Sequence, residues 1–130
     1  MIISAYAGPP APGGKVKIFP GPLYSLERVK ALAAEQEALI LWTQKCRRDI
    51  QNLHWDVTEV SDLLLGLSSR NYIDSEWCEN GKQAWAACDA YLTQRKEWVE
   101  RMRKQVSMSF FVKFAIGKTG KVVLLVSCHL

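Results

Sequence analysis

The sequence predicts an α+β domain with helices in the N-terminal half of the chain and a sheet in the C-terminal half. Residues 25–67 carry apolar side chains at the spacing of helix faces, and each group follows a helix-capping residue. Residues 108–130 contain two β-rich apolar runs on either side of Gly117-Lys-Thr-Gly120, the pattern of a β-hairpin. We therefore expect helices packed on a sheet that this hairpin completes.

Length and composition are those of one ordinary globular domain. The chain has 130 residues, of which 48% are hydrophobic and 23% charged, and a formal net charge of +4. This mild basic excess allows a nucleic acid or an acidic protein as partner. No apolar run approaches the roughly 18–20 residues of a membrane span, and no secretory signal is recognisable. We expect a cytoplasmic protein with no membrane partner.

The cysteines do not form a recognisable metal-binding pattern. Four of them are scattered without a Cys-x-x-Cys pair: Cys46, Cys78, Cys88 and Cys128. Close ligand pairs are typical of zinc sites, so reduced thiols are favoured over a metal site that also uses His54 and His129. We expect no metal and no other cofactor.

The first 21 residues differ in composition from the rest of the chain. Residues 8–14 read Gly-Pro-Pro-Ala-Pro-Gly-Gly, which disfavours both helix and sheet. We therefore expect residues 1–21 to form a flexible segment, in which Lys15–Phe19 can add a short strand. Residues 22–130 are expected to form a single domain.

Three helices are expected between residues 25 and 67. Ser25 can cap a helix that runs to about Glu37, and Thr43 can cap a second one. The sequence Asp56-Val-Thr-Glu59 matches a capping box and starts a third helix. Between the first two helices, Leu39–Trp42 is a short apolar run that fits a strand.

Several short motifs follow one another in a recognisable order. They are Pro22-Leu-Tyr-Ser-Leu-Glu-Arg-Val-Lys30, the helix beginning at Thr43, Leu63-Leu-Leu-Gly-Leu-Ser68 before Tyr72, Cys88-Asp-Ala-Tyr91, Phe111-Val-Lys-Phe114 and Val126-Ser127. This order resembles the motility quorum-sensing regulator (MqsR) toxin family, within the RelE-like bacterial toxins, over about residues 22–129. The resemblance implies a few helices packed on a twisted antiparallel sheet, mRNA cleavage as the activity, and an antitoxin encoded beside the toxin as partner.

Residues 82–106 allow two interpretations. Apolar residues from Trp85 to Val106 follow a seven-residue spacing that indicates a long helix, while residues 86–95 also alternate loosely as a strand does. In the family that the chain resembles, the Asp-x-Tyr segment is a strand. We therefore expect a strand over residues 86–95 and a helix only over about residues 96–105.

The chain departs from the family at four polar catalytic positions. Asp74 stands where family members carry Lys, Cys88 where they carry Gln, Phe111 where they carry Tyr, and His129 where they carry Lys. Either the chemistry uses other side chains, or the fold serves another task.

The candidate catalytic residues are His129, Lys113, Tyr91 and Asp89. Metal-free RNA cleavage needs a base for the 2′-hydroxyl, an acid for the leaving oxygen and a cation near the phosphate. His129 can act as base or acid near neutral pH, Lys113 can stabilise phosphate charge, and Tyr91 can donate a proton or stack on a base. Asp89 belongs to the Asp-x-Tyr motif of the resemblance. The alternative for His129 is a solvated side chain near the chain end, and for Lys113 a solvated strand face. Tyr91 could instead be an aromatic at the rim of the core, and Asp89 could cap a turn or pair with a nearby arginine.

Strand geometry predicts that Lys113, Ser127 and His129 share one face. If Lys118–Gly120 is a three-residue loop, Lys113 lies opposite Leu125, and the three polar side chains point to the same side. A two-residue loop would separate His129 from Lys113, and glycine at position 120 favours the longer loop.

The segment Gln94–Lys104 is a candidate RNA-binding surface. Arg95, Arg101 and Arg103 can follow phosphates while Trp98 stacks on a base. The alternative is a solvated helix face with ion pairs four residues apart.

The sequence therefore predicts the toxin component of a bacterial type II toxin–antitoxin system, a metal-independent mRNA endoribonuclease. Its substrate would be mRNA and its partner a cognate antitoxin, whereas the sequence does not indicate whether it associates with the ribosome. The alternative is a catalytically degenerate member of the same fold that binds RNA or protein. A role through a protein interface alone would be favoured if Trp77, Trp85 and Trp98 formed an exposed apolar patch.

Overall fold

The structure, a computed structural model, describes residues 1–6, 17–81 and 84–130. Within these residues the chain forms helices followed by long strands, which confirms the expected α+β class. The helices are α1 (Leu26–Ala34), α2 (Gln44–Leu53) and α3 (Val57–Leu65), with 3-10 turns η2 (Gln36–Ala38) and η3 (Ser69–Asn71). The strands are β1 (Lys17–Ile18), β2 (Leu39–Leu41), β3 (Tyr72–Glu79), β4 (Trp85–Val99), β5 (Lys104–Ile116) and β6 (Val123–His129).

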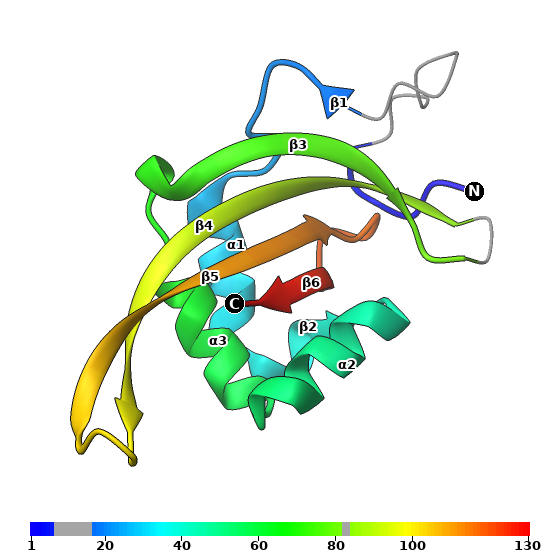
Figure 1. The fold of residues 1–130 in the computed structure, drawn as a ribbon. Helices are drawn as coiled ribbons and strands as arrows, with labels where there is room; N and C mark the ends of the chain where they lie inside the picture. The colour runs from blue at the N-terminus through cyan, green and yellow to red at the C-terminus, as the bar shows by residue number, and fades with distance from the viewer. Residues whose placement is uncertain (7–16, 82–83) are drawn as a thin grey trace.

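The strands form one sheet in the order β1-β3-β4-β5-β6-β2. Figure 1 shows β3, β4 and β5 as long curved strands that arch over the helices. Neighbouring strands are antiparallel, except that β2 runs parallel to β6 at one edge. The expectation of a purely antiparallel sheet is therefore corrected. The Leu39–Leu41 run lies along the outer side of β6, where it satisfies backbone groups that would otherwise lack partners.

The helices begin where the capping residues predict. The Ser25 side chain accepts a hydrogen bond from Arg28 N, and the Thr43 side chain accepts one from Cys46 N. Asp56 opens α3 with a complete capping box. The first helix ends at Ala34, earlier than expected, and the chain continues through the separate turn η2. Helix starts depend on contacts within one turn, which is why a single sequence predicts them well.

The helix expected over residues 96–105 is wrong. Strand β4 continues to Val99 and β5 begins at Lys104, so this segment is the tip of a long hairpin. Met102, which belongs to the proposed helical stripe, is 52% exposed, and the nearby Trp98 is 56% exposed. A helix here would have no core against which to bury its apolar face, whereas pairing with β5 satisfies the backbone along the whole strand.

The first residues of the chain contact the sheet. Ile3 N donates to Trp85 O at 2.9 Å, and the buried Ser4 hydroxyl accepts from Ala87 N at 3.0 Å. Lys17 and Ile18 form β1 beside β3. Contacts with the domain therefore begin before residue 22, while residues 7–16 of the expected flexible segment lie outside the described residues.

The hydrophobic core lies between the helices and one face of the sheet. Side chains from all three helices and from the central strands meet there, among them Val29, Ile50, Leu64, Phe110, Val112 and Phe114. Because side chains alternate along a strand, the residues between the core positions of β4 and β5 project from the opposite face. That opposite face carries the polar residues of interest.

Candidate functional site

Side chains of four strands lie on one side of the sheet, which we call the Lys113 face and on which Cys88 and Ala90 are buried. Its members are Asp74, Glu76 and Cys78 of β3, Cys88, Ala90 and Leu92 of β4, Phe111 and Lys113 of β5, and Ser127 and His129 of β6. The strand register places Asp74, Ala90, Lys113 and Ser127 in one row across the sheet. The next row contains Leu92, Phe111 and His129. The positions at which the chain departs from the MqsR-like pattern therefore all lie on this face.

The predicted register of the last hairpin is wrong. Gly117 N donates to Val122 O at 2.9 Å, so the loop contains four residues, and Lys113 lies opposite Ser127 instead of Leu125. The expectation that Lys113, Ser127 and His129 share a face is nevertheless confirmed.

A β-bulge explains why the shared face survives the change of register. A four-residue loop alone would shift the pairing by one position and turn His129 away from Lys113. The register shifts once more between Lys113 and Phe114, so that Val126 is an extra residue on β6. The two shifts together restore the alternation.

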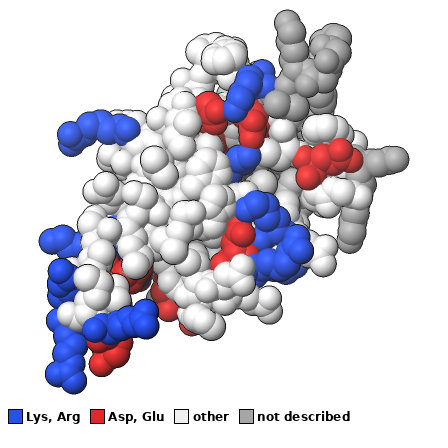
Figure 2. Space-filling view, viewed as in Figure 1, with Lys and Arg blue, Asp and Glu red and all other residues white. Residues whose placement is uncertain are grey.

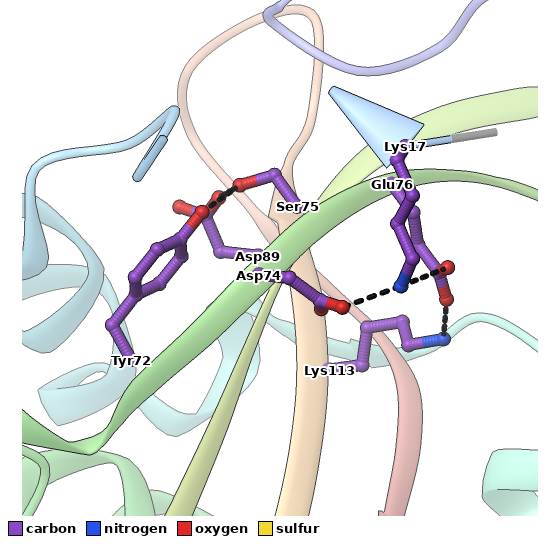
Figure 3. Close-up of polar contacts among 7 residues, drawn as sticks. All are labelled: Lys17, Tyr72, Asp74, Ser75, Glu76, Asp89 and Lys113. Atoms are coloured by element: carbon purple, nitrogen blue, oxygen red, sulfur yellow. Dashed lines mark hydrogen bonds and ion pairs between the residues drawn. The ribbon is translucent and has the colours of Figure 1, made fainter. Parts of the chain in front are cut away.

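Lys113 belongs to an ion network with two acids and a second lysine (Figure 3). Its ammonium pairs with Glu76, whose carboxylate also lies 3.1 Å from Lys17 Nζ, and Lys17 pairs with Asp74. Burial alone would raise the pKa of Glu76, but hydrogen bonds from Lys113 and Lys17 outweigh it and lower that pKa. Burial would lower the pKa of Lys113, but Glu76 outweighs it and the net shift is upward. Lys113 is therefore a fixed and fully charged cation.

An aromatic pair lies beside this cation. The rings of Phe111 and His129 stack with centroids 5.2 Å apart and an angle of 25° between their planes. Lys113 Nζ lies 5.7 Å from the centroid of the Phe111 ring. His129 Nδ1 is 2.9 Å from Leu130 O. A cation, an aromatic surface and an imidazole thus lie together. The cation can contact a phosphate, the aromatic ring can stack on a base, and the imidazole can transfer a proton.

Asp89 and Tyr91 lie on the other face of the sheet, within the core. Asp89 is 0% exposed and accepts hydrogen bonds from Leu23 N, Tyr24 N and the Ser75 hydroxyl. Figure 3 shows Asp89 and Ser75 on the opposite side of β3 from the lysine network. Burial raises the pKa of Asp89, and these hydrogen bonds partly oppose the rise. The arrangement anchors the segment before α1 and places Asp89 apart from His129 and Lys113.

Tyr91 is part of an aromatic stack in the core. Its ring lies parallel to Phe114 at 5.5 Å and edge-on to Tyr72 at 5.7 Å. The side chain is 1% exposed, and burial raises its pKa to about 12. Tyr91 therefore does not reach a molecule bound on the Lys113 face.

The predicted RNA-binding residues divide between two locations. Arg95 turns toward the helices, where its guanidinium lies 4.9 Å from the Trp55 ring centroid and pairs with Glu97 at 3.0 Å. Trp98, Arg101 and Arg103 are exposed at the tip of the β4–β5 hairpin. Figure 2 shows lysines and arginines gathered there, at the lower left of the view. Trp98 projects from the same side of the hairpin as the Lys113 face.

The sequence did not reveal the partners of Lys113. Lys17, Asp74 and Glu76 are brought to it by β1 and β3, and no strand was predicted for residues 72–79. The alternation of charged Asp74 and Glu76 with buried Ser75 and Trp77 was the available signal. Trp77 is buried, so the exposed patch of three tryptophans that would favour a role through a protein interface alone does not form.

The described residues contain neither a metal-binding cluster nor a helix that could span a membrane. Within residues 1–6, 17–81 and 84–130, no three His, Cys, Asp or Glu side chains are grouped as ligands of a metal ion would be. No helix in these ranges is long and apolar enough to cross a membrane. Compared with known proteins, the chain matches no model of a protein family. It also matches no curated protein sequence.

Proposed function

We propose that the protein binds single-stranded RNA on the Lys113 face and along the adjoining side of the β4–β5 hairpin. The observation that carries this proposal is the stacked Phe111–His129 pair beside the fixed Lys113 cation. Aromatic rings that stack on bases, combined with cations that follow the phosphates, are the usual means of binding single strands.

The surface between this pair and the hairpin tip supports an extended strand of RNA. Leu92 and Trp98 on the same side of β4 are 49% and 56% exposed, and Arg101 and Arg103 lie beyond them at the tip. Apolar contacts with bases and a cationic end fit a polyanion better than they fit a dry protein interface.

The test is RNA affinity measured by fluorescence anisotropy at several salt concentrations. Arg101→Ala with Arg103→Ala should reduce the slope of log K against log salt by about 1.4, since each phosphate contact contributes about 0.7 for single strands. Phe111→Ala should weaken binding by about 1–3 kcal/mol with the slope unchanged. Lys118→Ala with Lys121→Ala, at the exposed β5–β6 loop, is the matched control for charge. Equal effects of the two double variants, or no binding by the wild type, would contradict the proposal.

The second candidate is the toxin endoribonuclease that the MqsR-like motifs suggest, neutralised by an antitoxin. The specific observation in its favour is that His129 and Lys113 lie on one face, where an acid or base and a phosphate cation would be needed. Induced expression in a bacterial host should then arrest growth and produce new RNA 5′ ends. His129→Ala should abolish both at unchanged thermal stability. Intact RNA with the wild type would reject cleavage and leave the binding proposal standing.

A further inference from the structure

A cavity of ≈ 430 Å³ lies between the start of α2 and the Lys113 face. Its lining includes the cap and first turn of α2, two residues of β3 and one residue each of β5 and β6: Thr43, Gln44, Lys45, Cys78, Glu79, Lys113 and Ser127. The cavity thus adjoins the surface on which we propose that RNA binds.

Ser127 lines this cavity, and its side chain is largely buried. The residue is 5% exposed, and no group in the described part of the chain forms a hydrogen bond with its side chain. Its hydroxyl oxygen is not among the fully enclosed unpaired atoms of the described residues, so it reaches the open space of the cavity. Ser127 is therefore ready to donate to, or accept from, a molecule in the cavity.

The N-terminus of α2 forms another wall of the cavity. The Thr43 side chain accepts from Cys46 N at 3.0 Å and donates to Val126 O at 2.7 Å, which fixes the start of the ten-residue helix against β6. The first N–H groups of a helix, here those of Gln44 and Lys45, have no acceptor within the helix. Together with the helix dipole they favour an anion at this position.

Lys113 supplies a cation on the facing strand. Its ammonium has three donors, of which one pairs with Glu76 and another lies toward the Cys78 thiol. Lys45 also lines the cavity, although its ammonium pairs with Asp49 at 2.8 Å. Donors from β6, α2 and β5 therefore line one space, and the exposed Glu79 lies at its β3 side. Several donors around one space suit a group with several acceptor oxygens.

We propose that this cavity binds a phosphate group of the RNA strand that lies on the Lys113 face, with Ser127, the first turn of α2 and Lys113 as its donors. This inference rests on the proposed function. Ser127 lies opposite Lys113, one row from the Phe111–His129 pair, so a base stacked on that pair has a backbone phosphate within reach of the cavity. The cavity also has room for the ribose attached to that phosphate.

Cys78 provides a direct reporter of occupancy. It lines the cavity and is half-buried, whereas Cys46, Cys88 and Cys128 are buried. Alkylation of Cys78 by iodoacetamide, followed by mass spectrometry, should be slowed by the RNA oligonucleotide and by 5′-adenosine monophosphate. Adenosine, which lacks the phosphate, should protect Cys78 much less. Inorganic phosphate should compete with the nucleotide.

Two variants and a control identify the donors. Ser127→Ala should weaken the protection by the nucleotide roughly tenfold, because one charge-assisted hydrogen bond is lost. Glu76→Gln should strengthen it, because Lys113 no longer shares its charge with an internal carboxylate. Ser69→Ala is the matched control, since Ser69 is an exposed serine of η3 outside the cavity lining.

The outcomes separate this inference from the proposed function. RNA that binds without protecting Cys78, with affinity unchanged by Ser127→Ala, would overturn the phosphate site and leave RNA binding intact. Protection by the nucleotide without any RNA binding would overturn the proposed function and would assign the cavity to a free nucleotide. Equal protection by adenosine and its monophosphate would overturn phosphate recognition itself.

Discussion

The buried carboxylate of Asp89 offers the sharpest test of how this fold is held together. Leu23 N lies 3.0 Å from each carboxylate oxygen, Tyr24 N lies 3.1 Å from one of them, and the Ser75 hydroxyl lies 2.6 Å from the other. These bonds connect the central strands to the segment that leads into α1. Asp89→Ala removes the acceptor for all of these donors at once.

The expected loss of stability follows from what remains after the substitution. Ser75 keeps a partner, because its hydroxyl also lies 2.6 Å from the Tyr72 hydroxyl. The N–H groups of Leu23 and Tyr24 have no other acceptor in the described part of the chain, and each buried unsatisfied donor costs about 1–3 kcal/mol. Removing a buried charge offsets part of this cost, so we expect a loss of about 2–4 kcal/mol. That is a large share of the roughly 5–15 kcal/mol that stabilise a typical domain.

Equilibrium unfolding in urea, followed by tryptophan fluorescence, measures this loss. Asp62→Ala is the control, since Asp62 is an exposed carboxylate on α3, and it should change the unfolding free energy by less than about 0.5 kcal/mol. A loss for Asp89→Ala no larger than that of the control would refute the structural role assigned to Asp89. The slope of free energy against urea should stay constant in both variants.

Three further predictions concern pH, backbone conformation and thiols. The pKa of Glu76 is lower in the folded chain than its usual value of 4.5. Ionised Glu76 therefore stabilises the fold above that pH, and this stabilisation is lost as pH falls through the folded pKa. In urea titrations, Glu76→Gln should lose less stability than the wild type between about pH 5 and pH 3. Gly120 has φ +76°, and a Cβ added there would lie 3.0 Å from an arginine side chain, so Gly120→Ala should lower the unfolding free energy by about 1 kcal/mol. Gly66 has a right-handed conformation, so Gly66→Ala should not lower it. Burial raises the pKa of Cys46 and of Cys128 to about 12, so both should resist alkylation at neutral pH until urea unfolds the chain; rapid labelling of the native protein would contradict their burial.

Local signals in the sequence predicted the helical half of the fold correctly. Ser25, Thr43 and Asp56 each cap the helix that follows them, because a capping bond needs only the next three residues. The same kind of signal failed over residues 96–105. There the spacing of apolar residues indicated a helix, but the choice depended on a partner strand and on a core that this segment does not reach.

The candidate site was predictable only in part. Alternation along each strand, combined with an assumed three-residue loop, led to the expectation that Lys113, Ser127 and His129 share one face. The register that joins them required a four-residue loop and a bulge at Val126, neither of which has a distinct signature in one sequence. Asp89 and Tyr91 were expected at the same site and lie instead within the core, because β4 turns them toward the helices.

The sequence by itself determined the α+β class, the starts of the helices and the terminal hairpin. These features depend on neighbours within a few positions, and periodicity and capping report such neighbours directly. Only the tertiary structure decided that Glu76 from β3 would pair with Lys113, that β2 would lie parallel to β6, and that α2 would close a cavity over Ser127. Each of those contacts joins segments far apart in the chain, and the composition of either segment alone does not specify its distant partner.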